Sequence, residues 1–178
     1  MGALSEERLR ELPVAGLLGA AGLALPAVCH MFPGNLGPVL LPMYLPVFVG
    51  GFLLSPPLAA MLGLLLPPLS MVITGMPPAP VCPLMMAELT ALGGATALVY
   101  KALKPRKWAL WAGLLSGIVS SRAAGFFFLL LLGNFLGIRK PAWLFVAASF
   151  ITGLPGTLPQ IIVVPPVVKV LEARRGGG

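Results

Sequence analysis

Long apolar stretches, separated by short polar or proline-rich breaks, dominate the chain. The apolar stretches cover residues 12–29, 38–54, 58–73, 82–103, 108–132 and 142–168. A helix needs about 20 mainly apolar residues to cross a ~30 Å hydrocarbon core, and each stretch is near that length. The breaks contain residues that end helices, such as Ser55-Pro56-Pro57. The pattern predicts an all-α, polytopic membrane protein: a six-helix bundle in a single transmembrane domain over residues 1–178.

The composition also indicates a protein that is surrounded by lipid. Of the 178 residues, 58% are hydrophobic and 10% are charged, and the mean hydropathy is +0.98. This leaves too little polar surface to cover a water-soluble globule. The net charge of +7 does not suggest nucleic acid, because the basic residues lie mainly at the ends of apolar stretches, where membrane topology explains them.

The distribution of Lys and Arg predicts the orientation in the membrane. If both termini are cytoplasmic, the inner segments hold Arg8, Arg10, Lys101, Lys104, Arg106, Lys107, Lys169, Arg174 and Arg175. The outer loops then hold only Arg139 and Lys140. Because cytoplasmic segments carry an excess of positive charge, we expect both termini inside. The first stretch lacks a small-residue cleavage site, so we expect it to stay in the membrane.

Two charged residues lie inside apolar stretches, Glu88 and Arg122. At 1.5 Å per residue, each lies about 9 Å from the predicted outer boundary. Ionisable groups within a span are costly and commonly functional. Arg offers a planar fork for a carboxylate or phosphate, and Glu accepts hydroxyl or amide hydrogens. The two residues either bind a small polar ligand or form a structural salt bridge between two helices.

Other candidate ligand contacts lie on the same predicted side. His30 and Asn35 follow the first stretch, Met76 lies in the break after the third, and Asn134 follows the fifth. Binding sites commonly form where loops gather on one face. His30 also fits a plain interfacial position, and Asn134 a helix cap. Gln160 follows a break that contains Gly and Pro, which produces either a kink or a backbone-lined cavity.

The sequence contains no pattern for catalysis, a metal or a cofactor. It has one His, no Asp and no His or Cys cluster with metal-ligand spacing, so we expect no enzyme. We expect Cys29 and Cys82 to pack as apolar residues. Gly16, Ala20 and Ala24 recur every four residues in the first stretch, and this small face predicts a partner helix from this chain or from another subunit.

The motifs Leu41–Val47, Thr74–Pro78 and Met86–Leu89 resemble the substrate-binding S component of energy-coupling factor (ECF) vitamin transporters. The resemblance covers the first four stretches, over half of the chain. It implies a six-helix subunit of the prokaryotic plasma membrane that captures a water-soluble vitamin or precursor from outside. The partners it implies are a transmembrane coupling subunit and two cytoplasmic ATPase subunits.

The resemblance also implies where these contacts lie. In the family, the first helix docks on the coupling subunit through a small face, which corresponds to Ala20 and Ala24, with Gly16 extending the row. The family's ligand site lies at the outer ends of helices four to six and the loop after helix one, regions that include Glu88 and Arg122. Two alternatives remain open: a structural subunit of a membrane complex, and a stand-alone carrier coupled to protons through Glu88.

Overall fold

The structure is a computed structural model that describes residues 2–30, 43–79, 81–132, 158, 160–171 and 173. These residues form α1 (Gly2–His30), α3 (Tyr44–Leu53), α4 (Pro56–Thr74), α5 (Cys82–Leu103), α6 (Ala109–Leu132) and a C-terminal helix (Gln160–Leu171). No strand occurs among them. Within this described part of the chain, four helices are long and apolar enough to cross a membrane: α4, α5, α6 and the Leu9–Pro26 part of α1. The prediction of an all-α protein with several membrane helices is therefore confirmed.

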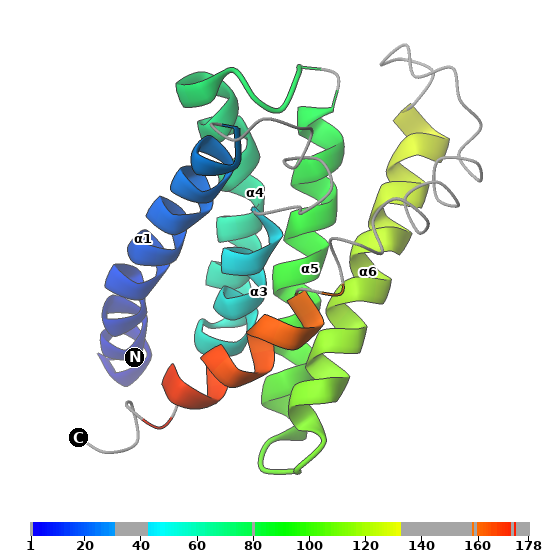
Figure 1. The fold of residues 1–178 in the computed structure, drawn as a ribbon. Coiled ribbons are helices and arrows are strands. Elements are labelled where there is room, and N and C mark those ends of the chain that lie inside the picture. Colours follow the sequence, from blue (N-terminus) through cyan, green and yellow to red (C-terminus); the bar gives the residue numbers. More distant parts are fainter. Residues whose placement is uncertain are drawn as a thin grey trace.

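The helices form a bundle in which α5 is central (Figure 1). It packs against α3, α4 and α6, whereas α1 packs against α3 and α4 at the edge. The start of α1 and the turns α3–α4 and α5–α6 lie at one end of the bundle, at the bottom of Figure 1, which we call the basal end. The end of α6 and the connection from α4 to α5 lie at the opposite, distal end.

The helix bounds differ from the expected stretches at three places. Helix α1 begins at Gly2 rather than at residue 12, because the Glu, Arg and Leu residues before the apolar stretch are themselves good helix formers. The described part of the second stretch is helical only over Tyr44–Leu53. The C-terminal helix continues to Leu171, and residues 142–157 of the sixth stretch lie outside the described residues.

Helix α4 ends at the Thr-Gly pair in the break after the third stretch. Gly75 has a positive φ of 73°, and its N–H donates to the carbonyl of Met71 at 3.0 Å. The Thr74 hydroxyl donates to the carbonyl of Ser70 at 2.8 Å. A left-handed glycine that closes the last turn is a common helix end, since only glycine adopts this conformation without strain.

Small residues bring the helices around α5 into close contact. Gly113, Gly117, Ser121 and Gly125 recur every four residues and form the buried face of α6. A Cβ added at Gly117 would lie 3.3 Å from the carbonyl oxygen of Leu92 on α5. On the other side of α5, a Cβ added at Gly63 of α4 would lie 2.7 Å from the backbone nitrogen of Thr90. Such small faces allow backbones to approach in membrane bundles, and this face of α6 was not among the predicted contacts.

Candidate binding site

Glu88 is a buried carboxylate among apolar helices. It lies in the distal half of α5 and is 6% exposed. The hydroxyl of Tyr44, at the start of α3, donates a hydrogen bond to Oε2 of Glu88. Tyr44 is itself 3% exposed, so its hydroxyl also needs a partner. The hydrogen bond therefore satisfies two buried polar groups at once and ties α3 to α5.

The second oxygen of Glu88 faces α6. A Cβ added at Gly125 would meet Glu88 Oε1 and would lie 3.1 Å from both Cγ and Cδ of the same side chain. The missing side chain at position 125 thus provides the space for a carboxylate between α5 and α6. One oxygen of Glu88 is engaged by Tyr44 and the other is directed at the helix that carries Arg122.

Arg122 lies one turn before Gly125 on α6, so the two residues share a side of this helix. Its side chain is half-buried, and its charge acts on both Glu88 and Tyr44. Arg122 and Glu88, both described, do not form a direct ion pair. The structural salt bridge considered as one alternative is therefore not made, and Tyr44 is the hydrogen-bond partner of Glu88 instead.

Two of the other expected ligand contacts, Met76 and Gln160, lie among the described residues. Met76 is exposed in the connection between α4 and α5, and Gln160 is buried at the start of the C-terminal helix. The Nε2 of Gln160 has no hydrogen-bond partner within the described chain. His30 ends α1, and its side chain is not described; Asn35 and Asn134 lie outside the described residues.

Tyr44 and Gly125 were missed as site residues. Tyr44 is one of two tyrosines in the chain and lies in an apolar stretch, where its hydroxyl requires a buried partner. Glu88 was the single acidic residue inside a span that could provide one. Gly125 could have been found from the four-residue spacing of small residues before it.

The small face of α1 points away from the bundle. Gly16, Ala20 and Ala24 are all exposed, and nothing lies within 4 Å of a Cβ added at Gly16. The opposite face packs on α4 through Gly22, where an added Cβ would lie 2.8 Å from Leu66 Cδ1. The described part of this chain therefore supplies no partner helix for the outward face, which we call the α1 stripe.

Long apolar helices around a buried charged cluster define a multi-pass membrane protein. A family model for the ECF transporter substrate-specific component matches residues 10–168. No curated protein and no solved structure matches the chain significantly. The chain belongs to the family of ECF transporter substrate-specific components, and the resemblance seen in its motifs is confirmed. It is a multi-pass protein of the prokaryotic plasma membrane, and its family is one of transporter components, not of enzymes.

Proposed function

We propose that the chain captures a small water-soluble vitamin or vitamin precursor from outside the cell. A transmembrane coupling subunit and two cytoplasmic ATPase subunits then drive its uptake. Membership of the substrate-specific family supports the role in capture. The observation that carries the proposal is the cluster of Tyr44, Glu88 and Arg122 within otherwise apolar helices, since a membrane span rarely retains such groups without a function.

The cluster favours a ligand that has both hydrogen-bond donors and a negative group. Glu88 Oε1 is directed at α6 and accepts hydroxyl or amide hydrogens, since an ionised carboxylate has acceptors and no donor. The guanidinium of Arg122 has five donors and suits a carboxylate or phosphate. In this proposal, the regions of His30, Asn35, Met76, Asn134 and Gln160 supply further contacts.

We propose further that the basal end faces the cytoplasm, so that the cluster lies in the outer half of the membrane. The α5–α6 turn at the basal end contains Lys104, Arg106 and Lys107. Arg106 lies 5.5 Å above the ring of Trp108, and Trp108 is 51% exposed. Basic residues beside exposed tryptophans are typical of the cytoplasmic interface. The α1 stripe, exposed on a membrane helix, is the proposed docking surface for the coupling subunit.

The proposal is tested by purification in mild detergent, followed by mass spectrometry of co-purified metabolites and calorimetric titration with a vitamin panel. We expect one vitamin or precursor to bind. Glu88→Gln and Arg122→Gln should each lower the affinity for this ligand about tenfold or more. Lys107→Gln, which removes a charge at the basal end, is the matched control and leaves binding unchanged. A protein that is consistently empty and ignores the whole panel would contradict the proposal.

The hydrogen bond from Tyr44 to Glu88 also favours one alternative, a purely structural role that holds α3 against α5. A variant with both Tyr44→Phe and Glu88→Met separates the two. Replacing a buried polar pair by apolar residues of similar volume is often neutral for stability. A structural pair therefore predicts a stable variant with normal uptake, whereas the proposed site predicts a stable variant that has lost ligand binding.

A further inference from the structure

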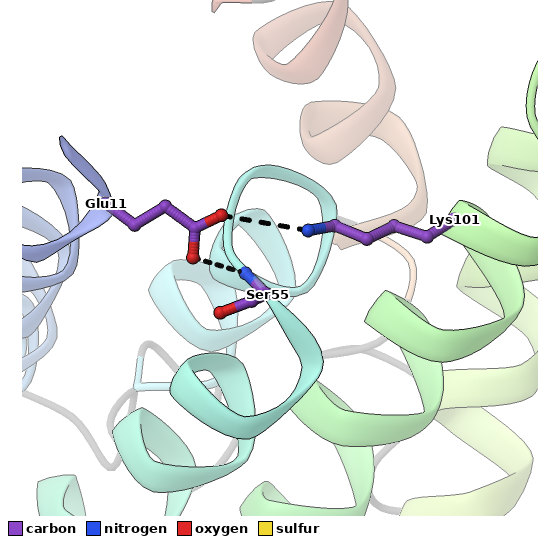
Figure 2. A network of polar contacts seen from close by, with 3 residues as sticks. All are labelled: Glu11, Ser55 and Lys101. Carbon is purple, nitrogen blue, oxygen red and sulfur yellow. Dashed lines mark hydrogen bonds and ion pairs between the residues drawn. The ribbon is translucent and has the colours of Figure 1, made fainter. Parts of the chain in front are cut away.

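One carboxylate joins three helices at the basal end of the bundle (Figure 2). Glu11 of α1 accepts a hydrogen bond from the backbone N–H of Ser55 through Oε2 at 2.7 Å. Its other oxygen, Oε1, lies 3.7 Å from Nζ of Lys101. Ser55 is the residue that precedes α4, and Lys101 lies in the last turn of α5. Glu11 therefore connects α1 to the start of one core helix and the end of another.

The contact with Ser55 replaces a cap that α4 lacks. In a capping box, a Glu at the third helical position accepts a hydrogen bond from the backbone N–H of the capping residue. In α4 that position is Leu58, and Ser55 makes no side-chain capping bond of its own. Glu11 supplies the acceptor from a different helix, and its negative charge lies at the positive end of the α4 dipole. It is 18% exposed, so bulk water screens this interaction only in part.

The position of α1 depends strongly on the contacts of Glu11, because packing buries less of α1 than of the core helices. Only 11% of its apolar part, Leu9–Pro26, is buried inside the bundle, compared with 28% to 44% for α4, α5 and α6. It packs against α3 and α4, and the ion pair with Lys101 connects it to α5. Glu11 also lies on the same helix side as Gly19 and Gly22, eight and eleven residues later, which face the α4 side chains. Because the α1 stripe lies on the opposite side of the helix, holding the Glu11 side against the bundle directs the α1 stripe away from it.

We propose that Glu11 is the positioning residue of α1, and that it sets the orientation in which the α1 stripe meets the coupling subunit. The anchoring of α1 follows from the contacts of this chain alone. The effect on docking rests on the proposed function of the α1 stripe, so the two parts need separate measurements.

The first measurement follows α1 in the isolated chain. Spin labels replace the exposed residues Leu12 on α1 and Leu115 on α6, in a background with Cys29→Ala and Cys82→Ala, and pulsed spin resonance gives the distance distribution in lipid nanodiscs. Glu11→Gln keeps an acceptor for Ser55 but loses the ion pair. We expect the ratio of the population with α1 packed on α3 and α4 to the population with α1 displaced from them to fall about two- to fivefold. Glu11→Leu loses both contacts, and we expect about ten- to thirtyfold.

In a double-mutant cycle, Glu11→Gln and Lys101→Gln should be clearly less than additive, because each removes the ion pair between Glu11 and Lys101. Lys107→Gln removes a charge from the same end of the bundle and should leave the distribution unchanged. If Glu11→Leu fails to fold, the double-mutant cycle of Glu11→Gln and Lys101→Gln still tests whether Glu11 anchors α1. Distributions identical to the parent in both single variants would overturn the anchoring of α1.

The second measurement is co-purification of each variant with a co-expressed coupling subunit. We expect Glu11→Gln and Lys101→Gln to lower the recovered complex two- to fivefold and Lys107→Gln to leave it unchanged. Normal recovery, with α1 displaced in the first measurement, would overturn the role of Glu11 in docking. If Ala20→Leu also leaves recovery normal, the proposed docking surface itself is wrong, and this outcome is distinct from a failure of the Glu11 anchor.

Discussion

Gly125 provides the sharpest test of the candidate site, because one methyl group there acts on Glu88 directly. The Cβ of Gly125→Ala would meet Oε1 and lie 3.1 Å from Cδ of Glu88, and the carboxylate, at the end of a flexible side chain, would move aside. Alanine in a helix interior gains roughly 1 kcal/mol over glycine. The displaced Glu88 loses a charged hydrogen bond with Tyr44, worth about 1.5–3 kcal/mol.

The net loss of stability from Gly125→Ala is therefore only about 1 kcal/mol. Ligand affinity should fall much more, by about ten- to a hundredfold, because the moved carboxylate no longer faces the ligand. Thermal unfolding in detergent gives the first quantity, and calorimetric titration with the co-purified metabolite gives the second. Gly16→Ala, where nothing lies within 4 Å of the new Cβ, is the matched control and should leave affinity unchanged. Unchanged affinity in Gly125→Ala as well would refute the assignment of Glu88 to the site.

Three further outcomes are expected. Gly63→Ala should destabilise the chain by about 2–4 kcal/mol in detergent unfolding, since its Cβ would meet the α5 backbone near Thr90, which cannot move aside like a side chain; a stable variant would contradict the close α4–α5 packing. Tyr44→Phe should cost about 1–3 kcal/mol with Glu88 present and much less in a Glu88→Met background, as a double-mutant cycle measures. Ala20→Leu should leave unfolding unchanged but abolish co-purification with the coupling subunit, and normal recovery would exclude the α1 stripe as a docking surface.

The fold was more predictable from the sequence than the contacts of its polar groups. Membrane helices are set by long local runs of apolar residues, so α4, α5 and α6 begin and end within two residues of the expected stretches. Glu88 and Arg122 were also identified locally, because a charge within an apolar stretch needs an explanation. The partner of Glu88 was not identified from the sequence, because Tyr44 lies 44 residues away and reaches Glu88 only through the packing of α3 on α5.

The contacts of Glu11 show the same limit. Glu11 lies directly before the first apolar stretch, and nothing in the sequence around it indicates a contact with another helix. The structure places it against the start of α4 and the end of α5. That role depends on the packing of α1 against α3 and α4, which the periodicity of α1 does not specify. Contacts between helices at the ends of the spans can therefore be identified only from the three-dimensional structure.

Helix α3 lies between the two carboxylates and gives a last prediction. Its ten residues span about 15 Å, with Tyr44 bonded to Glu88 at one end and Ser55, two residues beyond the other end, bonded to Glu11. Because a helix moves as a rigid element, a ligand that engages Glu88 should act on α1 through α3. The added ligand should change the α1–α6 distance distribution in the parent and have little effect in Tyr44→Phe at saturating ligand. An equal response in both would show that the connection does not pass through α3.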